Sequence, residues 1–203
     1  MSGEVVIVAG GKKEIVLKEN EQKTVLILTN EDCSLKVRLS GEGSQLRLLG
    51  AVVARREKVV KVQTEIIHQA RDTRAKIVLK GVVFDTARVN IFGSVVIDRG
   101  ARDSDDSLTE NILLLGDGAR GESYPYLEID ENDVTAKHAA TVGQIGEEEL
   151  FYLSARGVAK NEAEKLVTAG FLAPILGEIP DGQRGKIAQG WKVWLNEFDQ
   201  TES

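Results

Sequence analysis

The sequence has a single cysteine, Cys33, among its 203 residues. One thiol cannot form an internal disulfide, and it cannot supply the several thiolates that a metal centre built from cysteines requires. Its neighbours, Asp32 and Ser34, are typical of a turn that leads into a strand, where a small buried side chain is the ordinary role of cysteine. A reactive or metal-binding thiol stays open as the alternative, because thiol reactivity depends on its surroundings in space.

Long apolar runs are also missing, and the only basic cluster, at residues 55–61, is predicted to be a solvated strand edge. No segment approaches the roughly 20 consecutive apolar residues of a membrane-spanning helix, and the stretch from Met1 to Glu4 lacks the basic start of a secretory signal. With 26 basic and 32 acidic residues the net charge is -6, whereas nucleic-acid binding needs clustered Lys and Arg. We therefore expect a soluble, cytoplasmic protein that binds neither membranes nor nucleic acids.

Motifs for nucleotide binding and for hydrolysis are absent too. The run Gly10-Gly11-Lys12-Lys13 lacks the first glycine and the Ser or Thr of a phosphate-binding loop. The two histidines, His68 and His138, occur without a nucleophile elbow, so they indicate no Ser-His-Asp site. The chain is predicted not to be an enzyme.

Short runs of Val, Ile and Leu, separated by Gly, Asp and Asn, follow one another from Val5 to about Ala136. This is the pattern of β-strands. Within residues 35–39, apolar residues alternate with Lys and Arg, which predicts one buried and one solvated face. Similar glycine-led runs begin at Gly81 and at Gly93, 12 residues apart, and suggest successive turns of a solenoid. An all-β sandwich would give strands of the same length and spacing.

The hydrophobic period changes to that of helices after Gly143. Three glutamates at 147–149 and the pair Arg156-Gly157 are typical of the two ends of a short helix. A second apolar stripe runs from Ala163 to Phe171 and is predicted to pause at Pro174. Beyond a linker at 177–182, a last helical stripe is formed by Ile187, Trp191, Trp194, Leu195 and Phe198. We expect a β core over residues 1–143 and a helical segment over residues 144–203.

Six short motifs follow one another in order between Asn111 and Phe171. They are the LLL run at 113–115, the P-x-LEI run at 125–129, the DV pair at 133–134, the H-x-AT-x-G frame at 138–143, the LFYL-x-x-RG run at 150–157 and the apolar stripe at 163–171. Together they resemble the C-terminal core of the SufB/SufD family, scaffold components of a SUF-system machine for iron–sulfur cluster assembly. The resemblance extends back to about Ile66, and the chain would be a short member of the family.

The resemblance implies both a fold and a role. Members of this family build the strand region as a right-handed parallel β-helix, so the expected fold is mostly β, with a β-helix core followed by a small helical segment. The implied function is that of a non-enzymatic scaffold subunit. Its implied partners are a SufC-like ABC ATPase, docked by the C-terminal helices, and a second SufB/SufD-type subunit or another copy of itself.

Particular residues carry these expectations. His138 matches a family histidine that lies where two scaffold subunits meet, so it is a candidate interface or cluster residue. Cluster ligands found in relatives are missing, because Ala136, Ala139 and Glu110 occupy their positions. We therefore expect the isolated chain to bind no metal or cofactor, while a transient iron–sulfur cluster at a subunit interface stays open. Residues expected to contact the ATPase are Phe151, Tyr152, Arg156, Phe171 and Leu172.

Other polar residues are expected to be solvated. His68 is predicted to be an exposed turn histidine, and the alternative that the resemblance implies is a role in the interior path of the family. Glu110 is predicted to be an exposed residue that opens a strand, and the alternative is a carboxylate ligand to iron. The acidic run of Asp103, Asp105 and Asp106 is predicted to be a solvated loop, since it lacks the glycine and glutamate of an EF-hand. Two other functions stay open: a homo-oligomeric β-solenoid interaction protein without a cluster role, and a carbohydrate-active β-helix enzyme. Only 5% of the residues are aromatic, which disfavours the latter.

Overall fold

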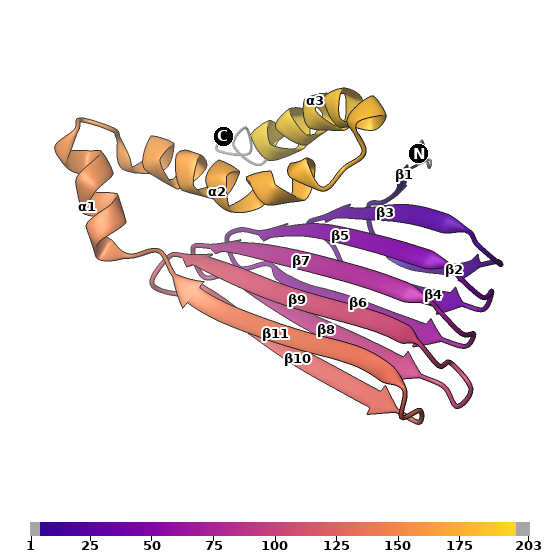
Figure 1. Ribbon diagram of the computed structural model, residues 1–203. Coiled ribbons are helices and arrows are strands. Elements are labelled where there is room, and N and C mark those ends of the chain that lie inside the picture. Colours follow the sequence, from indigo (N-terminus) through magenta and orange to yellow (C-terminus); the bar gives the residue numbers. More distant parts are fainter. Residues whose placement is uncertain (1–4, 198–203) are drawn as a thin grey trace.

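The structure is a computed structural model that describes residues 5–197; the side chains of Glu147, Glu149, Leu150, Lys160, Asn161 and residues 192–197 lie outside this description. The described chain winds through eleven strands and then continues into three helices (Figure 1). The strands are β1 (Val5–Val8), β2 (Gly11–Leu17), β3 (Gln22–Thr29), β4 (Cys33–Leu39), β5 (Gln45–Ala54), β6 (Val59–His68), β7 (Arg74–Phe84), β8 (Arg88–Ile97), β9 (Ser104–Leu115), β10 (Arg120–Ile129) and β11 (Val134–Gln144). The helices are α1 (Glu147–Ala155), α2 (Lys160–Gly177) and α3 (Asp181–Glu197).

The strands alternate between two sheets. Sheet A contains the odd-numbered strands in the order β1-β3-β5-β7-β9-β11, and sheet B contains the even-numbered strands in the order β10-β8-β6-β4-β2. Every neighbouring pair within a sheet is parallel. The chain is therefore a flattened parallel β-solenoid, with one strand of each sheet in every turn. This confirms the predicted fold class, and within residues 5–143 there is no helix.

The repeat within the solenoid differs from the expectation. The registers of Gln45 with Arg74 and of Arg74 with Asp105 give repeats of 29 and 31 residues. The runs beginning at Gly81 and Gly93 belong to β7 and β8, consecutive strands in opposite sheets. The 12-residue spacing is therefore one strand plus its corner, and the prediction that it marked a full turn was wrong.

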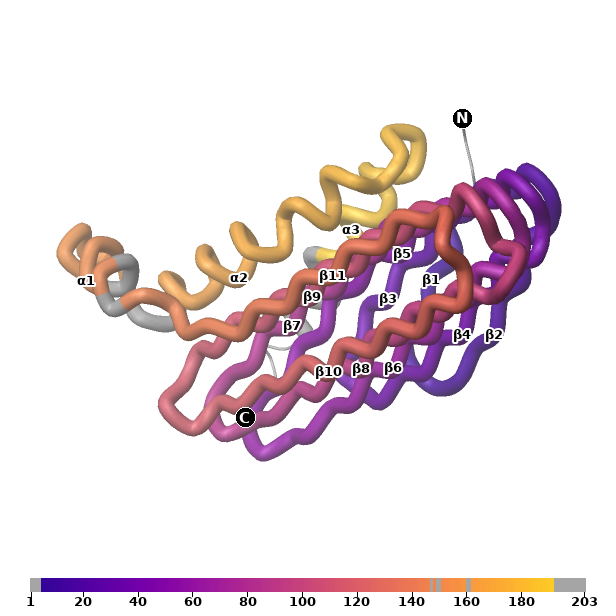
Figure 2. Tube along the Cα trace, turned by 60° about the horizontal axis from the view of Figure 1, so that its bottom comes forward, coloured from indigo at the N-terminus to yellow at the C-terminus, as the bar shows by residue number. Residues whose placement is uncertain are grey.

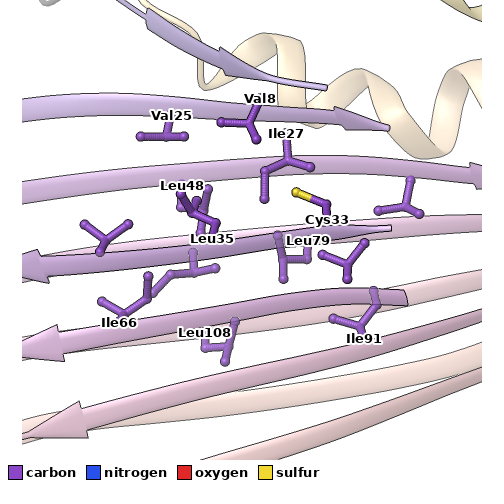
Figure 3. Close-up of a cluster of buried hydrophobic side chains, with 14 of the residues drawn as sticks. Val8, Val25, Ile27, Cys33, Leu35, Leu48, Ile66, Leu79, Ile91 and Leu108 are labelled. Atoms are coloured by element: carbon purple, nitrogen blue, oxygen red, sulfur yellow. The ribbon is translucent and has the colours of Figure 1, made fainter. Parts of the chain in front are cut away.

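Inward-facing side chains of the two sheets meet in an apolar core. Leu35 and Ile66 of sheet B lie within this core together with Leu48, Leu79 and Leu108 of sheet A (Figure 3), and each is at most 2% exposed. The alternation predicted for residues 35–39 is confirmed, because Leu35, Val37 and Leu39 are buried while the residues between them are only partly buried. Stacking of equivalent positions along the solenoid fills the lumen with branched aliphatic side chains.

A second core lies on the outer face of sheet A. Helices α2 and α3 run back over the early strands of this sheet (Figures 1 and 2), whereas α1 projects past the strand ends. The buried residues of this second core come from both layers: Leu26, Leu49, Ala51, Val53, Val82, Phe84 and Leu115 from the strands, and Leu172, Ile175, Ile179, Ile187 and Trp191 from the helices and their connection. Sheet A is therefore apolar on both faces there, as is usual for a parallel sheet covered by helices.

Pro174 does not interrupt α2, contrary to the sequence-based expectation. The helix continues through Pro174 to Gly177. Leu172 and Ile175 are buried against sheet A on either side of the exposed proline, and tertiary packing of this kind outweighs the one hydrogen bond that proline removes. At the end of α2, Arg184 donates hydrogen bonds to the carbonyl oxygens of Leu176 and Gly177 at 3.0 Å each.

The last predicted helical stripe is only partly described. Ile187 and Trp191 are buried in the second core, whereas Phe198 and the side chains of Trp194 and Leu195 lie outside the described residues. No helix within residues 5–197 is long and apolar enough to cross a membrane.

Candidate functional site

The solenoid ends openly at its last turn. Within residues 5–197 no further strand follows β10 or β11 in its sheet, so both strands present an unpaired edge (Figure 2). Leu127 and Ile129 of β10 are 43% and 40% exposed, and Val142 of β11 is 42% exposed, although their register partners in the preceding turn are buried. The lumen can therefore be reached from this end.

Glu110 lies inside the lumen just behind that open end. Its residue is 0% exposed, and the Ser123 hydroxyl of β10 donates a short hydrogen bond to its Oε2 atom. The carboxyl group occupies the space opposite Gly93 of β8, where a Cβ atom would overlap it. The expectation of an exposed residue opening a strand was wrong, because Glu110 is in the middle of β9 on an inward-facing position.

His138 lies beside Glu110 on the last strand. Its Nε2 atom is 3.8 Å from Glu110 Oε2, and its side chain is 15% exposed, whereas that of Glu110 is 0% exposed. His138 pairs in register with the inward-facing Leu108, which sets its side chain on the lumen side of β11. The histidine singled out by the sequence is thus at the mouth of the solenoid, in contact range of a buried carboxyl group.

Glu110 and His138 form a buried polar pair in which some atoms have hydrogen-bond partners and others do not. Burial raises the pKa of Glu110, and the hydrogen bond from Ser123 and the nearby His138 act in the opposite direction. Glu110 Oε1, His138 Nε2 and Thr64 Oγ1 are buried and have no hydrogen-bond partner within the described protein. Buried polar atoms of this kind normally bond to a water or a ligand, so the site has capacity for one.

Imidazole and carboxylate groups are both ligands for iron, but His138 and Glu110 supply only two such groups. Within the described residues no group of three or more His, Cys, Asp and Glu is placed to hold a metal ion. Ala136 pairs in register with Asp106, and Ala139 pairs with Thr109. Neither alanine adds a donor, so the described part of the last strand offers no third ligand beside His138 and Glu110.

Cys33 does not contribute to this site. It begins β4 and shares an inward row with Val62, Ile91 and Ser123, which places it three strands away from the last turn. The side chain is 2% exposed, and burial raises the pKa of its thiol. These features fit the ordinary buried role that the sequence indicates.

A second polar cluster lies at the corner of the solenoid between β6 and β7. His68 Nδ1 is 2.8 Å from Thr73 Oγ1 and His68 Nε2 is 3.0 Å from Asp106 Oδ2, while Thr73 Oγ1 is 2.7 Å from Ser104 Oγ. All four residues are at most 1% exposed. Burial raises the pKa of Asp106, and the hydrogen bond from His68 opposes this shift.

The corner cluster corrects two expectations. His68 is fully buried rather than an exposed turn residue, and Asp106 is buried rather than part of a solvated loop. Both point into the lumen because they occupy inward-facing positions of β6 and β9. Asp103 and Asp105 are exposed, as expected. The cluster joins the two sheets with satisfied hydrogen bonds and has no opening to solvent, which makes it structural.

The predicted partner-binding residues fall into two groups. Phe151 and Tyr152 of α1 are 73% and 56% exposed, and the Arg156 guanidinium lies 4.5 Å from the centre of the Tyr152 ring. Leu172 is 0% exposed against sheet A. Phe171 is half-buried, with the Lys80 ammonium 4.5 Å from its ring centre and bonded to its carbonyl oxygen at 2.5 Å. Only the first group is free at the surface.

Comparisons with known proteins agree with the sequence motifs. Residues 20–171 match the protein family described as SUF system FeS cluster assembly, SufBD core domain. The chain is 40% identical to the iron-sulfur cluster assembly protein SufD of Bacillus subtilis (strain 168) over 142 residues, which cover 70% of this chain and 32% of that protein. It is 35% identical to an iron-sulfur cluster assembly SufBD family protein of Mycobacterium tuberculosis, again over 70% of this chain but over 17% of the relative. A SufBD family protein of Staphylococcus epidermidis is 30% identical, with 30% of its length covered. The chain thus spans about a third or less of these relatives.

Proposed function

Because the chain belongs to the SufBD core family of SUF-system iron–sulfur cluster assembly proteins, we propose that it is a non-enzymatic scaffold subunit of a Suf-type assembly complex. It pairs with a second scaffold subunit through the open end of the solenoid. An iron–sulfur cluster, the cargo of the assembly, is held transiently at that junction near His138. An ABC-type ATPase docks on the C-terminal helices.

The observation that carries this proposal is the position of Glu110 and His138 at the only end of the solenoid where long strand edges lie open among the described residues. Two donors from one chain are too few for a cluster, which normally takes about four ligands. A second subunit facing the same end would add its own donors and would pair the open edges. Pairing and cargo binding therefore belong to the same surface.

The test of cargo binding is anaerobic reconstitution with iron and sulfide. We expect the monomeric chain to develop no visible charge-transfer absorption, because one subunit supplies two donors. We expect His138→Ala to reduce subunit pairing more than it reduces iron bound by the monomer. A stable cluster spectrum from the monomer that is abolished by His138→Ala or Cys33→Ala would show that one subunit holds a cluster by itself. That result would overturn the proposal that two subunits share the ligands.

Docking of the ATPase is supported by the exposed aromatic residues of α1. Phe151 and Tyr152 project from a helix that stands clear of the sheets (Figure 1), and exposed aromatic side chains near arginine are frequent binding hot spots. Phe171 and Leu172 instead hold α2 on the sheet, so their part in docking would be indirect.

The docking proposal is tested with an ABC ATPase encoded by the same organism. We expect Phe151→Ala or Tyr152→Ala to weaken binding by about 2 kcal/mol without lowering the melting temperature. Val59→Ala is the control, because Val59 is 60% exposed but belongs to β6 of sheet B and not to a helix. Unchanged affinity in folded Phe151→Ala and Tyr152→Ala variants would remove α1 from the docking surface and leave the pairing proposal untouched.

A further inference from the structure

The hydrogen bonds of the corner cluster of His68, Thr73, Ser104 and Asp106 can be arranged in two ways that differ by one proton. We propose that the cluster is a pH-sensitive switch, in which the His68–Asp106 pair takes up one proton and the Thr73 hydroxyl turns from His68 to the carbonyl oxygen of Ala70. The switch goes beyond the proposed scaffold function and does not depend on it. Its support is the geometry around Thr73, the number of donors and acceptors, and the burial of the pair.

Thr73 is the residue at which the two arrangements differ. Its Oγ1 atom lies 2.8 Å from His68 Nδ1, 3.2 Å from Ala70 O and 2.7 Å from Ser104 Oγ. All three distances are within the range of hydrogen bonds. A hydroxyl group has one proton to donate, so Thr73 can donate to His68 or to Ala70 but not to both at once. The direction of its bond therefore depends on whether His68 Nδ1 carries a proton.

In the arrangement without the extra proton, Asp106 is a carboxylate and His68 is neutral. The 3.0 Å contact between His68 Nε2 and Asp106 Oδ2 then requires a proton on Nε2, because a carboxylate only accepts hydrogen bonds. A neutral imidazole has one N–H group, so Nδ1 is left as an acceptor for the Thr73 hydroxyl. Ala70 O then has no hydrogen bond from Thr73. The Ser104 hydroxyl is 3.5 Å from Ala70 O, at the limit of hydrogen-bond range.

In the arrangement with the extra proton, every side-chain group of the cluster has a partner. The proton lies on the Asp106 carboxyl group, which then donates to His68 Nε2, or on His68 itself. In either case Nδ1 carries a proton and donates to Thr73 Oγ1. Thr73 then donates to Ala70 O at 3.2 Å, and Ser104 donates to Thr73. The protonated cluster thus makes one hydrogen bond more, which favours proton uptake in the folded state.

The surroundings of the pair also favour the protonated form. His68 and Asp106 are 0% and 1% exposed. Their register neighbours on four other strands are apolar: Leu39 and Ile97 beside His68, and Ala75 and Ala136 beside Asp106. Burial raises the pKa of Asp106, whereas the hydrogen bond from His68 and the charge of His138 lower it and the charge of Asp105 raises it. Burial has the largest effect, so the pair holds its proton above the pH at which an ordinary aspartate loses it.

The switch changes the charge of the lumen close to the open end. Loss of the proton leaves a negative charge on Asp106, which faces the lumen four residues before Glu110 on β9, about 13 Å away along the strand. Ser104 pairs in register with Val134, the first residue of the last strand, so the corner that the cluster holds lies directly behind that strand. An effect of this charge on cargo rests on the proposed function, whereas the switch itself stands if that function fails.

Nuclear magnetic resonance of the histidine rings tests the switch, because the chain has only two histidines and the His138→Ala variant shows His68 alone. The ¹⁵N resonance of a ring nitrogen reports whether that nitrogen carries a proton. Between about pH 3.5 and pH 8, which brackets the ordinary pKa values of aspartate and histidine, we expect His68 Nδ1 to lose its proton in one step as the pH rises. The carbonyl carbon of Ala70 should shift in the same step, because it loses the bond from Thr73. The carbonyl carbon of Ala51, in the middle of β5, should not shift.

Two pairs of matched variants assign the step to the cluster. Asp106→Asn removes the carboxyl group of the pair, so we expect the step of His68 Nδ1 to disappear. Asp105→Asn is its control, because Asp105 is the exposed neighbour on the same strand, and the step should remain. Thr73→Val removes the hydroxyl that carries the change to Ala70, so the Ala70 carbonyl carbon should no longer shift with pH. Thr73→Ser keeps a hydroxyl group and should keep that shift.

Three results would overturn the switch. The first is a His68 Nδ1 atom that keeps one protonation state over the whole pH range in which the protein is folded. The second is a step of His68 that survives Asp106→Asn. The third is an Ala70 carbonyl carbon that shifts as strongly in Thr73→Val as in Thr73→Ser. The titration of the unchanged cluster needs no substitution at the corner, so the first result decides the proposal even if a corner variant does not fold.

Discussion

Asp106 and Glu110 place two carboxyl groups in a lumen that is filled mostly by aliphatic side chains. Burial of a carboxyl group favours its neutral form. A hydrogen bond offsets part of the cost of burying each group: Asp106 is hydrogen-bonded to His68, and Glu110 accepts a hydrogen bond from Ser123. Asp106 is enclosed on all sides by the corner cluster, whereas Glu110 retains an oxygen atom without a partner. The first arrangement is structural and the second is poised to bind.

Asp106→Asn should change how stability depends on pH. Burial raises the pKa of Asp106 above its ordinary value of 3.8 in the folded state, so the folded protein binds a proton that the unfolded chain has already lost. The free energy of unfolding therefore falls as pH rises through the folded pKa. Asparagine removes this decline and can still bond to His68. We expect the variant to gain stability relative to wild type as the pH rises above 3.8, because only the wild-type chain has to give up a proton in the folded state.

Urea unfolding at a series of pH values measures this change. Asp105→Asn is the control, because Asp105 is the exposed neighbour on the same strand, and its variant should follow the wild-type curve. A constant difference between Asp106→Asn and wild type at all pH values would show that the buried carboxyl group does not titrate in this range.

Gly93→Ala should disturb the candidate site from the opposite sheet. An added Cβ atom would overlap the Glu110 carboxyl group and lie 2.7 Å from Leu108 Cδ2. Overpacking of this kind costs roughly 1–3 kcal/mol of unfolding free energy. Gly170→Ala in α2, which would meet nothing within 4 Å, should instead stabilise by about 0.5–1 kcal/mol. Equal effects of both substitutions, measured by chemical denaturation, would contradict the close approach of Glu110 to Gly93.

The sequence located one of the two residues of the candidate site. His138 was found through a motif, but Glu110 was taken for an exposed residue because charged side chains are usually solvated. A signal was present: Ser104, Asp106, Leu108, Glu110 and Ile112 alternate along β9, which puts them all on the face of Leu108. Because three of these inward residues are polar, the alternation of buried and exposed positions is hard to recognise. Burial of a carboxyl group also depends on hydrogen-bond partners from other strands. Residues distant in sequence, such as Ser123, supply those partners.

Helix α2 offers a matched pair of leucines. Leu172 is 0% exposed against sheet A, whereas Leu166 is 57% exposed on the same helix. We expect Leu172→Ala to lower the unfolding free energy by about 2–5 kcal/mol and Leu166→Ala to change it by less than about 0.5 kcal/mol. Thermal and urea unfolding measure both. Similar melting temperatures for the two variants would mean that α2 is not held on the sheet by this contact.

Secondary structure was predicted better for strands than for their arrangement. The alternation of apolar and charged residues at 35–39 correctly predicted which face of the strand is buried, because this pattern depends only on the strand's own residues. The repeat was misjudged because β7 and β8 have similar glycine-led runs although they belong to opposite sheets. Continuation of α2 through Pro174 was also missed, since it depends on packing against strands more than 80 residues earlier. Local patterns do not contain that information.

The β core and the helical segment are joined by a large apolar contact. This contact determines whether the β core can fold without the helices. A chain ending at Gln144 would keep every strand but would uncover Leu26, Leu49, Val53 and Val82 on sheet A. An exposed apolar sheet face promotes association. We expect such a truncated protein to aggregate and to melt at a lower temperature, as followed by size-exclusion chromatography and thermal unfolding. A soluble 1–144 fragment with an unchanged melting temperature would show two independent units.

The return of α2 and α3 over the early strands also governs the order in which the protein can be completed during synthesis. Each turn of the solenoid can stack on the previous one as it leaves the ribosome, since its contacts are with the turn just made. The outer face of β3 and β5, however, waits for helices that are translated after all eleven strands. At about 5–20 residues per second, that face stays uncovered for several seconds in every nascent chain. The newly made solenoid is thus a natural client for chaperones that shield apolar surface until α2 and α3 have been translated.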